Sequence, residues 1–172
     1  VKNSIGYDFK EGAVEIVSPD KWCSSDAEYT TEGATADRLR ASTWPTGPAY
    51  NRWFKFTATT NQLKATLKTG GDQGSLRHGL IALWDSVDNE ISSARYTYDY
   101  DHVTISANSL VPGETYWISV DNYDRSHYTG TFTLCVDDTL DYDFREAAIE
   151  FTDLDYWCST DAVFTTFDAT PD

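Results

Sequence analysis

The stretch Arg52-Trp53-Phe54-Lys55-Phe56-Thr57-Ala58-Thr59 decides the fold class, because large apolar and polar side chains alternate along it. A period of two is typical of a half-buried β-strand. Residues 62–68 repeat the alternation, and residues 80–84 form a short apolar run that suits a central strand of a sandwich. This part of the chain therefore predicts neighbouring β-strands.

Strand signals continue through the rest of the chain, and turn residues separate them. Val111-Pro112-Gly113-Glu114 predicts a turn, because proline presets φ and glycine adopts positive φ without strain. Loops are also expected at residues 44–48 and 70–74. Further strands are predicted at residues 93–98, 102–106, 116–120 and 131–136. Seven or more short strands without a helical period predict an all-β, antiparallel β-sandwich, and residues 7–16 are expected to form a first strand or a linker strand.

An internal repeat sets the domain organisation. Tyr7-Asp8-Phe9-Lys10-Glu11-Gly12-Ala13-Val14-Glu15 recurs as Tyr142-Asp143-Phe144-Arg145-Glu146-Ala147-Ala148-Ile149-Glu150. Over residues 7–37 and 142–172, 17 of 31 positions are identical at a constant offset of 135. Residues 1–6 are then expected to end a preceding repeat or linker, residues 7–137 to form a complete sandwich, and residues 138–172 to begin the next repeat. The alternative is a duplicated edge segment within one domain.

Composition excludes several classes of protein. The chain has 28 acidic and 13 basic residues, and its net charge of −15 argues against nucleic-acid binding. Eleven Tyr and six Trp supply large side chains for a core. The longest apolar run, residues 80–84, is far too short to span a bilayer. The sequence begins at Val1 without a signal peptide, so we expect a piece of a longer, processed polypeptide.

Several segments together resemble a known family. They are Asn51-Arg52-Trp53-Phe54-Lys55-Phe56, Ile81-Ala82-Leu83-Trp84-Asp85, the turn and strand 110–121, and Gly130-Thr131-Phe132-Thr133-Leu134-Cys135-Val136. The sequence resembles the bacterial pre-peptidase C-terminal domain, most specifically over residues 110–136. With its Tyr-Asp-Phe and Cys-Ser-Ser-Asp-Ala starts, the whole period is similar to tandem repeats of giant secreted Bacteroidetes surface proteins, including gliding and adhesion proteins.

The resemblance implies a jelly-roll-like sandwich without catalytic activity. We therefore expect a structural or adhesive repeat module of an exported bacterial surface filament or giant adhesin, located outside the cell. Its expected partners are neighbouring repeats of the same chain, other copies in a fibre, and surface glycans, with no nucleic acid, no membrane insertion and no required cofactor. The alternative, from another functional class, is a carbohydrate-binding accessory module of a secreted hydrolase.

The cysteines predict a disulfide. Each period holds two, Cys23 and Cys135, and Cys158 is the copy of Cys23. An even number per unit, in a family of exported proteins, favours pairing. Cys23 with Cys135 inside one unit is favoured, Cys135 with Cys158 across a junction is the alternative, and free buried thiols are a third interpretation.

Acidic pairs on predicted loops suggest a cation. Asp99 and Asp101 lie in a turn, and Asp121 and Asp124 lie just past a strand. Hard oxygen ligands on loops suit Ca²⁺, so a calcium site at these four residues is a hypothesis. The sequence has no EF-hand loop, and acidic loop residues more often serve as solvated turn formers.

The sequence offers no catalytic motif. His78, His102 and His127 have no zinc-binding spacing, and there is no Gly-x-Ser-x-Gly motif. We therefore expect no enzymatic activity.

Tyrosines gather around the same loops. Tyr98, Tyr100, Tyr123 and Tyr128 form a hypothetical glycan-binding site, since exposed rings stack on sugars. The alternative is that such tyrosines, like Tyr96 and Tyr98 at alternate positions, cover a sheet face.

Overall fold

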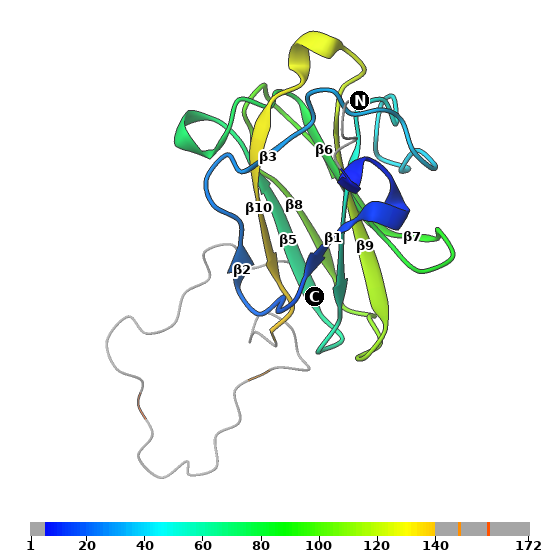
Figure 1. Cartoon of the computed structure of the whole chain (residues 1–172). Coiled ribbons are helices and arrows are strands. Elements are labelled where there is room, and N and C mark those ends of the chain that lie inside the picture. The colour runs from blue at the N-terminus through cyan, green and yellow to red at the C-terminus, as the bar shows by residue number, and fades with distance from the viewer. Residues whose placement is uncertain (1–5, 140–147, 149–157, 159–172) are drawn as a thin grey trace. The chain divides into compact units, whose positions relative to one another are not determined.

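The computed structural model describes residues 6–139 together with Ala148 and Cys158 (Figure 1). These residues form an all-β sandwich of two sheets, as the sequence predicts. The helical elements among them are short 3-10 turns, and none is a membrane-spanning helix. The predicted start of a second repeat at residues 138–172 lies almost wholly outside the described residues, as does most of the predicted linker at residues 1–6.

Each sheet has five strands. The first has the order β1 (Val14–Ile16), β4 (Arg52–Thr57), β9 (Thr115–Asn122), β6 (Gly79–Trp84) and β7 (Glu90–Arg95). The second has the order β2 (Trp22–Cys23), β10 (Thr131–Asp137), β5 (Leu63–Lys68) and β8 (Val103–Ala107), and β3 (Tyr29–Thr30) also pairs with β10. The longer strands of both sheets run roughly upright in the view of Figure 1.

The first strand differs from the expectation. Residues 7–16 begin with two 3-10 turns, η1 (Gly6–Asp8) and η2 (Lys10–Gly12), and only β1 is extended. The two turns bring Gly12 so close to Gly6 that a Cβ added to Gly12 would lie 1.7 Å from the carbonyl oxygen of Gly6. In this arrangement only glycine fits at position 12. Strand β1 then pairs parallel to β4, with Val14 opposite Phe54. The sandwich is thus antiparallel except at this edge.

The main core lies between the sheets. On β4 the side chains of Phe54 and Phe56 point inward, and on β5 those of Leu63, Ala65 and Leu67 do the same. Their alternation with polar residues is the period that the sequence displays. Each large apolar side chain buried in this way contributes about 1.5–3 kcal/mol.

A second apolar cluster covers the outer face of the first sheet. Its members are Ala41, Trp44, Trp53, Leu80, Ala82 and Trp84. The loop between β3 and β4 brings Trp44 over the sheet, and the Trp44 indole donates a hydrogen bond to the carbonyl oxygen of Ile81 at 3.2 Å. Strand β6 is therefore buried on both faces, which is why residues 80–84 are apolar at every position.

Strand β7 lies three residues before its predicted place at 93–98. It pairs with β6, with Arg95 opposite Leu80, and the last bond runs from the Tyr96 N–H to the Gly79 carbonyl. Because β6 begins at Gly79, Tyr98 has no strand to pair with and lies in a turn instead. The alternating tyrosines that suggested a strand belong to the end of the sandwich.

Candidate functional site

The disulfide joins the N-terminal segment to the last strand. Cys23 of β2 pairs with Cys135 of β10, and the sulfur atoms are bonded at 2.07 Å with the Cα atoms 4.0 Å apart. This is the pairing that the sequence favours. Cys158, the partner in the alternative pairing, is a free, exposed thiol. The bridge closes a covalent loop with a sequence separation of 112.

The start of the unit is fastened at the beginning of β4. Arg52, 1% exposed, donates from Nη1 to Asp8 Oδ1 at 3.0 Å and from Nε and Nη2 to the carbonyl oxygens of Thr30 and Glu32. The Tyr7 ring lies 4.9 Å from the Arg52 guanidinium carbon. Three hydrogen bonds and a ring contact compensate this buried cation, so the contact holds the start of the chain on β4.

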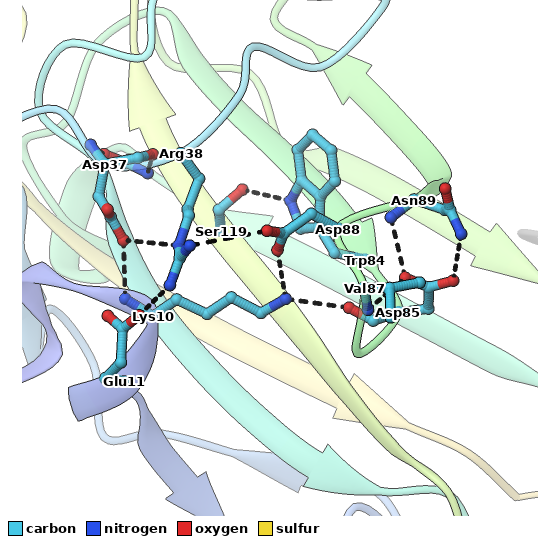
Figure 2. Close-up of polar contacts among 11 residues, drawn as sticks. Lys10, Glu11, Asp37, Arg38, Trp84, Asp85, Val87, Asp88, Asn89 and Ser119 are labelled. Atoms are coloured by element: carbon cyan, nitrogen blue, oxygen red, sulfur yellow. Dashed lines mark hydrogen bonds and ion pairs between the residues drawn. The ribbon is translucent and has the colours of Figure 1, made fainter.

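A second contact holds the same segment against the β6–β7 turn. Lys10 is 7% exposed, its ammonium lies 4.5 Å from the centre of the Trp117 ring, and it pairs with Asp88 and donates to the Asp85 carbonyl at 3.0 Å. Figure 2 shows Lys10 reaching across to this turn, with Arg38 beside it. Charged side chains of three separate segments thus meet over one face of the sheet.

Arg38 completes this network. Its guanidinium pairs with Glu11 and lies 3.7 Å from carboxylate oxygens of both Asp37 and Asp88 (Figure 2). Asp37 in turn accepts a hydrogen bond from the Lys10 N–H at 2.8 Å. Alternating positive and negative groups therefore tie η2, the loop at residues 37–38 and the β6–β7 turn together.

The end of the unit is fastened at the other end of β4. Asp138 is fully buried and accepts a hydrogen bond from the Thr59 N–H at 2.6 Å. The Thr60 hydroxyl donates to the Asp138 carbonyl, and the Asp138 N–H donates to the Pro19 carbonyl at 3.3 Å. Asp8 and Asp138 are thus held at opposite ends of one strand. We call these two regions the η4 end, which carries η4 (Ser126–Tyr128), and the Asp138 end.

His78 is the centre of a tyrosine cluster at the η4 end. Its ring centre lies 4.3 Å from that of Tyr96 and 4.4 Å from that of Tyr128, and Tyr123 packs against both tyrosines. The φ angle of His78 is 52°, a left-handed conformation that is uncommon for a residue other than glycine. Two backbone bonds hold this turn, from His78 N–H to the Asp99 carbonyl and from Tyr123 N–H to the His78 carbonyl.

Next to this cluster lies an exposed polar and aromatic surface. Tyr98 is 76% exposed and Tyr100 is 52% exposed, both on the turn after β7. The Arg77 guanidinium lies over the rings of Tyr100 and Tyr128, at 5.8 and 5.2 Å, and pairs with Asp99. The hydrogen bond from Arg77 holds the pKa of Asp99 below its ordinary value, so this carboxylate stays ionised.

The four predicted tyrosines therefore have two different places. Tyr98 and Tyr100 present their rings to solvent, whereas Tyr123 and Tyr128 are half-buried in the cluster around His78. The sequence did not identify Arg77, His78 or the paired role of Asp99. A basic and an imidazole side chain directly before the apolar run 80–84 were the available signal.

Two of the four predicted calcium ligands, Asp99 and Asp121, have hydrogen-bond or ion-pair partners within the protein. Asp99 pairs with Arg77 and with His78, whose Nε2 lies 2.7 Å from Asp99 Oδ1. Asp121 is fully buried and accepts bonds from the N–H groups of Ala49, Tyr50 and Asn122. Within residues 6–139, Ala148 and Cys158, no three His, Cys, Asp or Glu side chains are grouped to hold a metal ion. The calcium hypothesis keeps only its support from the sequence.

Asp121 has a different role, which is to fix the loop before β4. It joins residues 49 and 50 to the end of β9 through its two carboxylate oxygens. Burial raises the pKa of Asp121 to about 6, although its three backbone hydrogen bonds act in the opposite direction and Asp124 adds a smaller repulsion. It is the buried acid at the η4 end whose charge changes near neutral pH.

Comparisons with known proteins leave the family unassigned. No family model matches the sequence, and no curated protein matches it. One similar solved structure is the 1.0 Å crystal structure of the pre-peptidase C-terminal domain of a collagenase from Bacillus anthracis, at 15% identity. The likeness covers 72% of this chain and 93% of that chain, with a TM-score of 0.45. The strand pairing described above, rather than this likeness, assigns the β-sandwich fold.

Proposed function

We propose that this chain is a non-catalytic structural module from a tandem array in an exported bacterial surface filament or adhesin. The observation that carries the proposal is the placement of the two ends of the unit. Asp8 is bound to Arg52 at the start of β4, and Asp138 is bound to Thr59 just beyond its end. The six residues of β4 span about 20 Å, so units joined through these ends extend rather than fold back.

The repeat retains the groups that fasten the N-terminal segment. Tyr7, Asp8 and Asp37 recur as Tyr142, Asp143 and Asp172, and Lys10 is replaced by another cation, Arg145. In the first copy these groups bind Arg52, the Trp117 ring and the β6–β7 turn. This supports residues 142–172 as the corresponding segment of a second unit.

The joint between units is short in this proposal. Asp138 is bound to its own unit, and Tyr142 copies a residue that contacts Arg52. Four residue steps separate the two, which span at most about 14 Å. A linker this short would limit how far neighbouring sandwiches can separate, which suits a stalk.

The disulfide gives such a stalk a covalent route for tension. A pull on both ends passes through the N-terminal segment, across the Cys23–Cys135 bond and out through Val136 to Asp138. The residues between the two cysteines lie outside this path, so the core strands are shielded while the bond is intact. A stable disulfide also favours an oxidising compartment outside the cell.

Single-molecule stretching tests the proposal with the chain tethered through peptide tags at its termini. The oxidised chain should give only short extensions, from residues outside the bridge. Adding a reductant should lengthen the unfolded chain by about 390 Å, from a sequence separation of 112 at about 3.5 Å per residue. An oxidised chain that extends by its full length would contradict the proposed tension path.

The second candidate function is a carbohydrate-binding accessory module of a secreted hydrolase. Exposure of Tyr98 and Tyr100 beside Arg77 favours it. The two candidates differ in the rest of the polypeptide, where repeated periods of 135 residues support the array and a hydrolase domain supports the accessory module.

A further inference from the structure

We propose that the surface formed by Tyr98, Asp99, Tyr100 and Arg77 binds a neutral, hydroxyl-rich sugar polymer through its pyranose rings. We call this surface the Tyr98–Arg77 surface. The inference goes beyond the structural role above, and its failure would leave that role untouched.

Two ring faces are available for stacking. Tyr98 and Tyr100 lie two residues apart on one turn, closed by a bond from the Asp101 N–H to the Tyr98 carbonyl at 3.4 Å. Both are well exposed, at 76% and 52%. The C–H groups on one face of a pyranose ring pack on an aromatic face of this kind, and the tyrosine hydroxyl remains free for a polar contact.

Gly70 and Arg77 lie against Tyr100. Its Cβ packs on Gly70, where a Cβ in place of the glycine hydrogen would lie 3.2 Å from that of Tyr100. The Arg77 guanidinium lies near both Tyr100 and Tyr128, at 5.8 and 5.2 Å from their ring centres. The ring is thus backed by packed groups and loses little freedom when a ligand binds, which favours affinity.

The turn itself is bound to the rigid part of the fold. The carbonyl of Asp99 accepts a hydrogen bond from the His78 N–H at 2.9 Å, and its carboxylate lies 2.7 Å from His78 Nε2. His78 is packed between Tyr96 and Tyr128 and directly precedes β6. These two contacts to the residue that precedes β6 make the turn a preorganised platform.

Beside the rings, Arg77 and Asp99 offer donors and acceptors side by side. Their side chains are 36% and 43% exposed, so solvent or a ligand reaches both. A guanidinium donates and a carboxylate accepts, and adjacent sugar hydroxyls do both. The pair therefore matches a vicinal diol held over the neighbouring ring.

Charge and side-chain type select the class of ligand. The net charge of −15 disfavours polyanions, which require clustered cations. The other exposed large apolar side chains in the described part of the chain, apart from Phe9, are Val17, Leu39, Val87 and Val111, and none belongs to the segments that form the Tyr98–Arg77 surface. Exposed rings flanked by a charged pair fit a neutral glycan, and because tyrosine and arginine are also common in protein interfaces, the test includes a protein.

Affinity electrophoresis of the full chain tests the inference, with laminarin, mannan, xylan or dextran in separate native gels. At least one of these neutral polysaccharides should slow the protein. Truncating a ring that stacks on the ligand lowers affinity about tenfold or more, so Tyr98→Ala and Tyr100→Ala should each lose most of the retardation. Tyr98→Phe and Tyr100→Phe should keep it. Val87→Ala, at an exposed apolar position on the β6–β7 turn, is the matched control.

Three results would overturn the inference. One is the absence of retardation in all four neutral gels. Another is retardation that Tyr98→Ala and Tyr100→Ala leave unchanged while circular dichroism shows that both variants are folded. The last is retardation only in a gel that contains the polyanion alginate, or only in a gel that contains serum albumin in place of polysaccharide. The first result would assign the surface to polyanions, and the second would assign it to proteins.

Discussion

Cys23 and Cys135 are directly opposite each other in the β2–β10 pairing, and their disulfide joins the N-terminal segment to the last strand of the sandwich. One covalent bond therefore closes nearly the whole unit. The chain that precedes Cys23 and the chain that follows Cys135 are fastened to opposite ends of β4, through Asp8 and Asp138. This arrangement underlies the proposed role as a module in an extended array.

Loss of the disulfide should destabilise the sandwich. Loop entropy for a separation of 112 residues predicts a loss of about 5 kcal/mol in the free energy of unfolding for Cys23→Ala with Cys135→Ala. Urea titration with and without reductant measures it. Cys158→Ala, at the free thiol, is the matched control and should behave as the unaltered chain. If the double variant were as stable as Cys158→Ala, the Cys23–Cys135 disulfide would not stabilise the sandwich.

The buried Asp8–Arg52 pair should matter far more than a surface pair on the same strand. Arg52→Ala leaves Asp8 buried without its cation and should cost about 3–5 kcal/mol of unfolding free energy. Lys55→Ala removes an exposed pair with Glu15, 3.5 Å apart, and should cost less than about 1 kcal/mol. Thermal and urea unfolding compare the two. Similar losses for both variants would show that Arg52 does not anchor the N-terminal segment.

Position 10 should accept arginine but not alanine. Lys10→Ala removes the cation from the Trp117 ring and from Asp88, and should lower the free energy of unfolding by about 2 kcal/mol. Lys10→Arg should stay within about 1 kcal/mol of the unaltered chain, because an arginine keeps both contacts and the repeat carries Arg145 there. If Lys10→Arg is as damaging as Lys10→Ala, the two copies do not share this contact.

Asp121 should make stability depend on pH. Its pKa is raised from 3.8 to about 6 in the folded protein, so the folded state binds more protons between those values. The resulting stabilisation is present below about pH 4 and is lost as the pH rises through 6, a change of about 3 kcal/mol. Urea titrations from pH 4 to 7 measure it.

Two variants separate Asp121 from other acids in that titration. Asp121→Asn should abolish its contribution to the slope and also weaken the loop, because Ala49 and Tyr50 donate to different carboxylate oxygens and an asparagine amide has only one acceptor oxygen. Asp124→Asn removes a charge that raises the pKa of Asp121, so it should narrow the pH range over which the stability falls. If the free energy of unfolding of Asp121→Asn still falls with the same slope between pH 4 and 7, another group causes the pH dependence.

The sequence predicts most of the sandwich because its strands are local patterns. Alternation over residues 52–59 and 62–68 corresponds to β4 and β5, and the apolar run 80–84 corresponds to β6. The predicted bounds of a strand were wrong where pairing with a neighbouring strand, and not the alternation of side chains, decides where the strand ends. Tyr96 and Tyr98 alternate like a strand, yet β7 ends at Arg95 because its partner β6 begins at Gly79. The parallel pairing of β1 follows from the anchoring of Asp8, which is a contact between distant residues.

The candidate sites could be predicted only in part for the same reason. Exposed tyrosines near residue 100 are visible in the sequence, but their support by Arg77 and His78 depends on backbone bonds across the fold. Lys10 and Arg52 resemble surface residues until their partners on other segments are known. Burial of a charged side chain is set by the tertiary structure, so no local pattern in the sequence predicts it.

The most direct test of the central claim is the intact mass of the native protein combined with a non-reducing peptide map. A tandem array requires a polypeptide that contains many 135-residue periods, and we expect each peptide equivalent to Cys23 to be linked to the peptide equivalent to Cys135 of the same unit. A native mass near 19.3 kDa would contradict the tandem array. A larger polypeptide with a hydrolase domain and no further 135-residue periods would make the accessory module the better explanation.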